Sequence, residues 1–159
     1  MENLFHLDAA LFVCLRCFAL WNQAPSATAP LVLIVDDNRD TREMYALYLT
    51  MVGYSVETAA DGREAVVKAV TQRPDIIVMD LHMPGVDGWR AIREIRGEAK
   101  TAMTPIVVLT GHDFKHHLRA SALAEGARSY LVKPCLPEQL AREISEQLGT
   151  LRKKAISAV

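Results

Sequence analysis

The chain has 159 residues and half of them are apolar, so one domain of ordinary size can bury a core without disulfide bridges. Eighteen basic and nineteen acidic residues leave a formal net charge of −1, and no long run of Lys or Arg is present to follow a nucleic-acid backbone. The three cysteines are an odd number with no disulfide-like spacing, which favours a reducing, cytoplasmic location.

Residues 1–30 are interpreted as an apolar segment and a linker outside the main domain. Glu2 and Asp8 stand where an export signal would carry basic residues, and the apolar run is too short and interrupted to span a membrane. The stretch from Ala24 to Pro30 has the small residues and prolines of a connector. We therefore expect neither export nor a membrane span.

One apolar stripe within this segment has several interpretations. It repeats at spacings of three and four and would line one side of a helix, and its members are Leu4, Leu7, Leu11, Leu15 and Phe18. Docking on the domain or pairing with a second copy as a homodimer is preferred. A membrane-surface role is weakened by the scarcity of Lys and Arg. A non-core extension, or a start codon placed too early, is the alternative.

From Leu31 onward, short apolar runs alternate with longer helical patterns. The predicted strands are Leu31–Val35, Tyr54–Thr58, Ile76–Met79, Ile106–Leu109 and Ser129–Val132. The predicted helices are Thr41–Val52, Gly62–Gln72, Asp87–Ile95, Lys115–Ala124 and Pro137–Leu148. This alternation predicts a doubly wound α/β domain over residues 31–148, with a five-stranded parallel sheet flanked by five helices and a C-terminal tail at 149–159.

Polar residues follow four of the predicted strands. They are Asp36 and Asp37, Asp80, Thr110 and Lys133. Because sites in such sheets form at the carboxyl ends of the strands, we expect these side chains to meet at one rim. Three carboxylates that converge there repel one another and need a positive partner, and Mg²⁺ suits a site of oxygen ligands that admits phosphate.

The order and separation of several short motifs are more specific than any of them alone. The motifs are Val35 to Asn38, Met79 to Gly88, Leu109 to Gly111, Gly126 to Ala127 and Tyr130 to Pro134. On these motifs, residues 31–148 resemble the receiver domain of bacterial two-component response regulators, in a stand-alone form similar to the chemotaxis regulators. The resemblance implies a flavodoxin-like receiver fold and a role in phosphorelay signal transduction.

The resemblance also implies a role for each site residue. Asp80 would be the phosphoacceptor. Asp37, Asp80 and the backbone carbonyl of His82 would bind Mg²⁺ directly, and Asp36 would act on it through water. Lys133 would pair with the phosphoryl group or with Asp80. Pro134 stands where the family has a cis peptide bond.

The same resemblance implies a switch. Thr110 would move toward the phosphoryl group and Tyr130 would rotate into the vacated space, changing the surface formed by the fourth helix, fifth strand and fifth helix. Thr110 as an ordinary β-branched strand residue, and Tyr130 as an ordinary core aromatic, are the alternatives.

Other side chains suggest other sites, which we consider weaker. His82, His112, His116 and His117 do not have the arrangement of a zinc site, since His116 and His117 point in different directions. His82 and His112 flank the acceptor and would influence water access to it. Cys14 and Cys17 are interpreted as small apolar residues.

Two other functions compete with this interpretation. A haloacid-dehalogenase-type phosphatase would need an aspartate two residues after the nucleophile, where this chain has His82, and no nucleotide-binding glycine motif is present. An unphosphorylated docking module is less favoured because the five site residues are complete. We therefore expect a non-enzymatic receiver without a DNA-binding domain. Its partners would be a sensor histidine kinase or histidine phosphotransfer protein and an unknown output protein.

Overall fold

The computed structural model describes residues 29–111 and 117–157. In chain order the elements are β1 (Leu31–Val35), α2 (Arg39–Met51), β2 (Ser55–Ala59), α3 (Gly62–Gln72), β3 (Ile76–Met79), α4 (Gly88–Gly97), β4 (Ile106–Thr110), α5 (His117–Ala124), β5 (Ser129–Val132) and α6 (Pro137–Ser157). The five strands are parallel, in the order β2-β1-β3-β4-β5. The predicted doubly wound α/β fold is confirmed.

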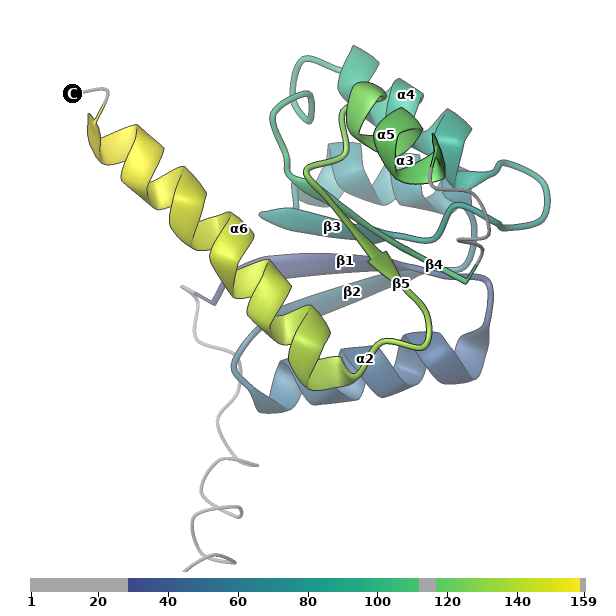
Figure 1. Ribbon diagram of the computed structural model, residues 1–159, viewed down its shortest axis with the longest axis horizontal. Helices are drawn as coiled ribbons and strands as arrows, with labels where there is room; N and C mark the ends of the chain where they lie inside the picture. The colour runs from purple at the N-terminus through teal and green to yellow at the C-terminus, as the bar shows by residue number, and fades with distance from the viewer. Residues whose placement is uncertain (1–28, 112–116, 158–159) are drawn as a thin grey trace, which may run out of the picture.

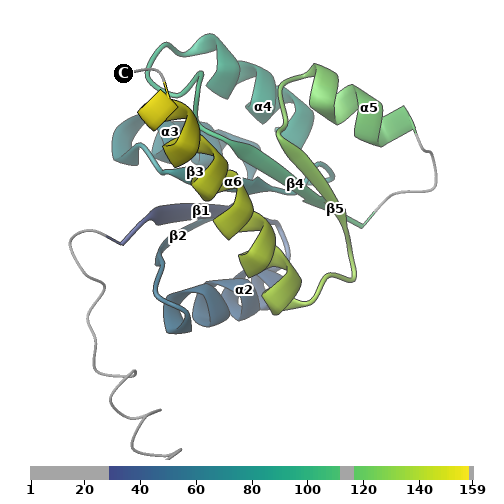
Figure 2. The same ribbon diagram turned by 60° about the vertical axis from the view of Figure 1, so that its left-hand side comes forward.

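Helices cover both faces of the sheet (Figures 1 and 2). α2 and α6 lie on one face, and α3, α4 and α5 lie on the other. The strand order reverses at β1, which has β2 on one side and β3 on the other. In open parallel sheets a site forms beside such a reversal, at the carboxyl ends of the strands.

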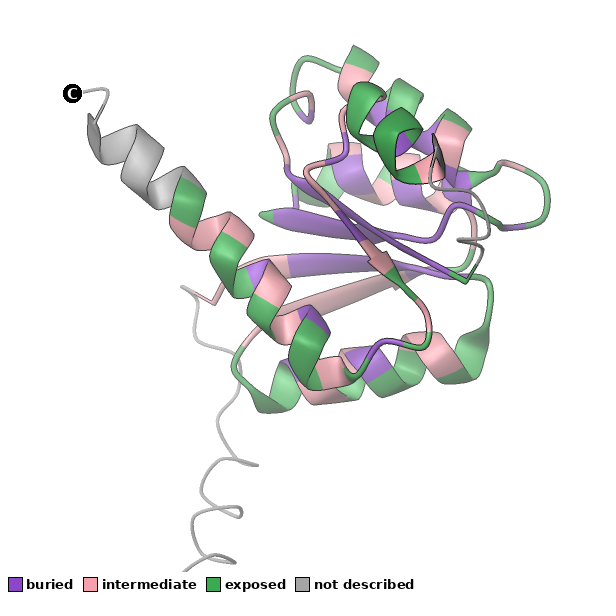
Figure 3. Ribbon diagram, in the orientation of Figure 1, coloured by how far each residue is buried: buried purple, intermediate pink, exposed green. Residues whose placement is uncertain are grey.

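The strand sequences explain why both faces are covered. Successive side chains of a strand point to opposite faces, so Leu33 and Val35 pack toward α3, α4 and α5, whereas Val32 and Ile34 pack toward α2 and α6. β3 and β4 are buried along their whole length (Figure 3). Unbroken apolar runs are therefore required in the central strands.

Side-chain caps fix the start of α2 and α4, which follow β1 and β3 in the chain. The Asn38 side chain accepts a 2.9 Å hydrogen bond from the backbone N–H of Thr41, so α2 begins at Arg39, two residues before the predicted start. The Asp87 side chain accepts one of 2.8 Å from the N–H of Arg90. Asp87 is thus the cap of α4 and not its first residue.

The last helix is longer than predicted. α6 continues through Gly149 to Ser157, whereas we expected it to end at Leu148, and Figure 1 shows it projecting past the sheet. A glycine inside a helix costs only about 1 kcal/mol relative to alanine, so Gly149 alone does not end it.

Smaller differences are that β4 includes Thr110 and that β2 is shifted by one residue. Neither α6 nor any other described helix has the length and apolar character needed to cross a bilayer.

Some predictions concern residues outside the described ranges. These are the apolar stripe and cysteines of residues 1–28, the side chains of His112, His116 and His117, and the helix start at Lys115. The domain boundary near residue 30 also stays a prediction.

Candidate functional site

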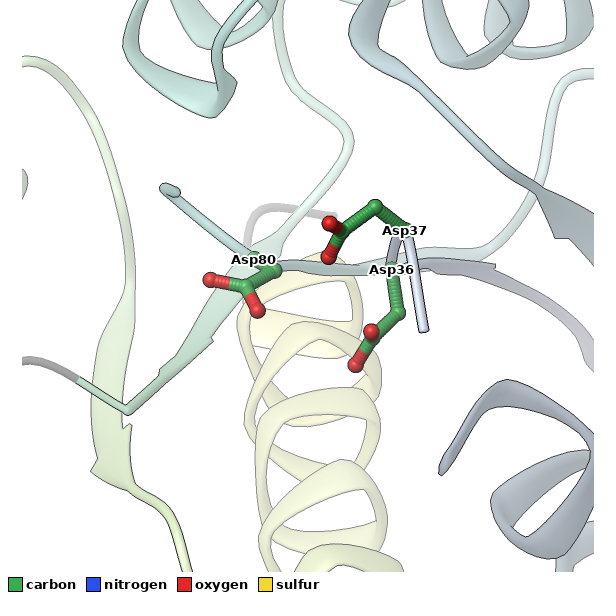
Figure 4. A group of neighbouring side chains, drawn as sticks. All are labelled: Asp36, Asp37 and Asp80. Carbon is green, nitrogen blue, oxygen red and sulfur yellow. The ribbon is translucent and has the colours of Figure 1, made fainter. Parts of the chain in front are cut away.

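Three carboxylates meet at the carboxyl ends of the two central strands. Asp36 and Asp37 follow β1 and Asp80 follows β3, and these strands are paired so that Val35 lies beside Met79. Carboxylate oxygens of the three residues lie within 4.8 Å of one another (Figure 4). Asp36 and Asp80 are buried and Asp37 is exposed. The predicted convergence is therefore confirmed, with an open side at Asp37.

Lys133 supplies the positive charge that this cluster needs. Its ammonium group lies 2.6 Å from an oxygen of Asp36 and 2.5 Å from one of Asp80. Burial disfavours the charged amine, but the hydrogen bonds and attraction from these two carboxylates outweigh it, so the pKa of Lys133 lies above its ordinary value. The contact with Asp80 was predicted, and the equally close contact with Asp36 was not.

Backbone and side-chain donors hold the loop of the acid pair in place. The second oxygen of Asp36 accepts a 2.9 Å hydrogen bond from the N–H of Asn38. The guanidinium of Arg42, one turn into α2, donates a 2.6 Å hydrogen bond to the backbone carbonyl of Asp36. Both carboxylate oxygens of Asp36 thus have a partner within the protein, and Asp37 is the exposed member of the pair.

Asp80 is similarly fixed at both carboxylate oxygens. One faces Lys133, and the other accepts a 3.1 Å hydrogen bond from the backbone N–H of His82. The Lys133 ammonium and the His82 N–H both contact the Asp80 carboxylate, and such donors stabilise additional negative charge beside it. Asp80 itself is buried, with 6% of its surface exposed.

Thr110 and Tyr130 lie on the two neighbouring strands. Thr110 ends β4 and is fully buried, and Nδ1 of His82 lies 3.1 Å from its hydroxyl oxygen. Tyr130 on β5 is 7% exposed and belongs to the core layer under α5. Core packing of Tyr130 is therefore observed, while movement of either residue stays a prediction.

The comparisons with known proteins identify the family. Residues 32–145 match the model of the response regulator receiver domain. The chain belongs to this family. It is 44% identical over 112 residues to the response regulator MprA of Mycolicibacterium vanbaalenii and 38% identical over 127 residues to a probable transcriptional regulator, ycf27, of Guillardia theta. These alignments cover 70% and 80% of this chain but only 47% and 48% of the relatives, so the chain spans about half their length.

Solved structures agree with this assignment. The chemotaxis protein CheY4 of Vibrio cholerae is similar with a TM-score of 0.71 and 38% identity, over 75% of this chain and 98% of that one. The receiver domain of the sensor histidine kinase PA1611 of Pseudomonas aeruginosa has a TM-score of 0.70 and 34% identity, over 77% and 99%. That structure has a magnesium ion coordinated in its active-site cleft.

Several features of this receiver domain were missed by sequence reasoning. A Cβ atom on Gly88 would lie 2.1 Å from the carbonyl oxygen of Asp80, so only glycine lets α4 start directly against the backbone of Asp80. The contact between His82 and Thr110 was also missed, because nothing in local spacing pairs residues on different strands. The cap at Asn38 has a recognisable signal, an Asn before a helical pattern.

The expected cis peptide bond between Lys133 and Pro134 is confirmed.

Among the described residues, no histidine joins a cluster of three potential metal ligands. Within the described residues, the cluster with the composition of a metal site is the acidic triad of Asp36, Asp37 and Asp80. A hard, oxygen-preferring cation fits this donor set better than zinc does.

Proposed function

We propose that this receiver domain accepts a phosphoryl group on Asp80 in a phosphorelay. The observation that carries the proposal is the double contact of the Asp80 carboxylate with the Lys133 ammonium and the His82 N–H. An oxygen of Asp80 forms a bond to phosphorus while the bond to the donor's leaving group breaks, and the leaving group keeps the electron pair. Lys133 then donates to a phosphoryl oxygen, which offsets the added charge.

The acidic cluster is proposed to hold Mg²⁺ during this reaction. Its ligands would be Asp37, Asp80 and the backbone carbonyl of His82, with Asp36 acting through water. When bound, the ion would neutralise phosphoryl oxygens as a Lewis acid. The three carboxylates support this assignment, and a magnesium ion in the related PA1611 receiver supports it further.

Phosphorylation is proposed to switch a surface formed by α5, β5 and α6. A phosphoryl group adds about −1.5 to −2 charges and three acceptor oxygens at Asp80, which would draw the Thr110 hydroxyl toward it. Tyr130 would rotate into the vacated space. Leu123, Val132 and Leu136 lie in this region and are 43%, 40% and 62% exposed, which suits a surface that binds a partner protein.

The partners proposed for this cycle are a sensor histidine kinase or a histidine phosphotransfer protein as donor and an output protein that binds the switched surface. A cytoplasmic location is proposed, because three cysteines without disulfide-like spacing suit a reducing compartment. The domain is not proposed to turn over a separate substrate.

Intact mass after incubation with Mg²⁺ and acetyl phosphate tests the proposal. The protein should gain one phosphoryl group, and Asp80→Asn should gain none, whereas Asp40→Asn, on an exposed carboxylate of α2, should behave as wild type. No gain in the wild type would identify an unphosphorylated docking module. Repeated turnover of unrelated phosphoesters would identify an enzyme.

A further inference from the structure

His82 contacts both the proposed acceptor and the proposed switch residue. It lies two residues after Asp80, and its backbone N–H donates to one Asp80 oxygen at 3.1 Å. Its ring nitrogen Nδ1 lies 3.1 Å from the hydroxyl oxygen of Thr110, which comes from the next strand. One exposed residue therefore joins the ends of β3 and β4 at the rim.

The ring and an incoming phosphoryl group would compete for the same hydroxyl. Thr110 is fully buried, so its hydroxyl benefits from a hydrogen bond in either state of the site. In the structure the His82 ring supplies one. If Thr110 moves to the phosphoryl group, this bond has to break before or as the new one forms.

We propose that His82 is a positioning residue that holds Thr110 in its unphosphorylated position and so raises the threshold for switching. This proposal rests on the proposed function of Asp80 and Thr110. The imidazole acts through the Thr110 hydroxyl, while its backbone N–H continues to serve the acceptor. Removing the ring favours the switched state, because the hydroxyl is released without loss of the N–H.

The size of the effect follows from the strength of one hydrogen bond. A single net hydrogen bond changes an equilibrium by about two- to tenfold. The apparent affinity for beryllofluoride, a phosphoryl analogue, should therefore rise by about that factor in His82→Ala, because binding and switching are thermodynamically linked. For the same reason, the NMR signal of the Thr110 methyl group in beryllofluoride-free His82→Ala should lie closer to the chemical shift of the beryllofluoride-bound protein.

The test uses the full chain with Mg²⁺ and a beryllofluoride titration followed by ¹⁹F NMR. His82→Ala is compared with wild type, and the same change is repeated in the Thr110→Val background, which has no hydroxyl to hold. The double-mutant cycle isolates the contact between the two side chains. His82→Asn is the conservative variant, since the side-chain amide of asparagine can replace the imidazole Nδ1 as a hydrogen-bond partner of Thr110. The Thr110 methyl signal is recorded in the variants that retain Thr110.

The expected result is a two- to tenfold tighter midpoint for His82→Ala in the wild-type background, no change in the Thr110→Val background and rescue by His82→Asn. An equal effect in both backgrounds, or none in either, would overturn the proposal. Failure of the proposed function is distinguishable, because beryllofluoride would then not bind at all or would bind equally to Asp80→Asn.

Discussion

The hydroxyl of Tyr45 donates a 2.7 Å hydrogen bond to the backbone carbonyl of Cys135, 90 residues later in the chain. Tyr45 lies on α2, which follows the acid pair, and Cys135 lies two residues after Lys133. The bond thus ties the helix behind the carboxylates to the segment that carries their counter-charge. Burial, with smaller contributions from Cys135 and Asp36, raises the pKa of Tyr45 to about 12.

Tyr45→Phe should destabilise the domain by about 1–3 kcal/mol, because it leaves the buried carbonyl of Cys135 without this donor. Urea unfolding measures the change. Tyr48→Phe is a matched control on the same helix, since its hydroxyl makes no hydrogen bond within the described part of the chain, and it should change stability by less than about 0.5 kcal/mol. Equal effects of the two variants would contradict the assigned role of the bond.

Alkaline stability gives a second test of the same bond. Since the folded pKa of Tyr45 is raised, its contribution is complete below the ordinary value of 10.0 and is lost as the pH rises toward about 12. The free energy of unfolding of the wild type should therefore fall between pH 10 and 12 more steeply than that of Tyr45→Phe. Parallel slopes would argue against a buried, protonated Tyr45.

Lys133→Met should weaken the fold and strengthen metal binding. The variant leaves the buried carboxylates of Asp36 and Asp80 without their counter-charge, which costs about 2 kcal/mol or more, given that the Lys133 side chain retains 20% exposure. Because the ammonium no longer competes for these oxygens, Mg²⁺ should bind about tenfold more tightly. Calorimetric titration measures this affinity, and the exposed Lys100→Met is the control. Weaker binding in Lys133→Met would show that Lys133 organises the site for the cation.

The pH dependence of this contribution has a defined sign. Since the pKa of Lys133 is raised, the stability it provides is complete below the ordinary value of 10.5 and is lost as the pH rises through the raised value. The stability difference between wild type and Lys133→Met should therefore persist through neutral pH and shrink only in strong alkali.

Most of the fold was predictable because it depends on local patterns. The unbroken apolar run Ile76–Met79 predicts a strand buried on both faces, and its bounds are as predicted. The bounds of α3, Gly62–Gln72, were also predicted, and in the structure the Asp61 side chain caps its start and Pro74 follows its end. The end of α6 was not predictable from Gly149, since one glycine does not decide where a long helix stops.

The site was predictable in position and less so in its connections. Strand ends and the rule for parallel sheets bring Asp36, Asp80 and Lys133 together without any knowledge of side-chain geometry. The pairing of Lys133 with Asp36, and of His82 with Thr110, depends on rotamers and on the register between strands. Those quantities are set by three-dimensional packing, which residue spacing does not encode.

Gly88→Ala should displace Asp80, the proposed phosphoacceptor. A methyl group there would overlap the backbone of Asp80 and Leu81, so strand β3 and helix α4 would have to separate, at a cost of about 2 kcal/mol. Phosphorylation by acetyl phosphate should slow in proportion to the displacement of Asp80. Gly97→Ala, at the other end of α4 and with nothing within 4 Å of the added atom, should leave the phosphorylation rate unchanged and should not lower stability, since alanine favours the helix by up to about 1 kcal/mol. A normal rate in Gly88→Ala would show that the acceptor tolerates the shift.

Removal of residues 1–29 should leave the domain folded and able to accept phosphate on Asp80. The first described contacts support this boundary, because the carbonyl of Pro30 accepts a hydrogen bond from Ser55 and the N–H of Leu31 donates one to Asp75. Circular dichroism and intact mass test the two properties. A chain that fails to fold would place the segment in the core, and a change confined to sedimentation would identify it as an association surface.

The contacts of Lys133 have a consequence for how the nascent chain matures. Lys133 is separated in sequence from Asp80 by 53 positions and from Asp36 by 97. The three residues directly follow three different strands, β1, β3 and β5. Lys133 follows both aspartates in the chain, so the acidic rim is synthesised before its counter-charge, and contacts that close such long loops form slowly. A growing chain that has not yet added β5 holds aspartates at the rim without the lysine. Competence to accept phosphate should therefore appear only when the last strand docks, and it would report completion of folding during synthesis.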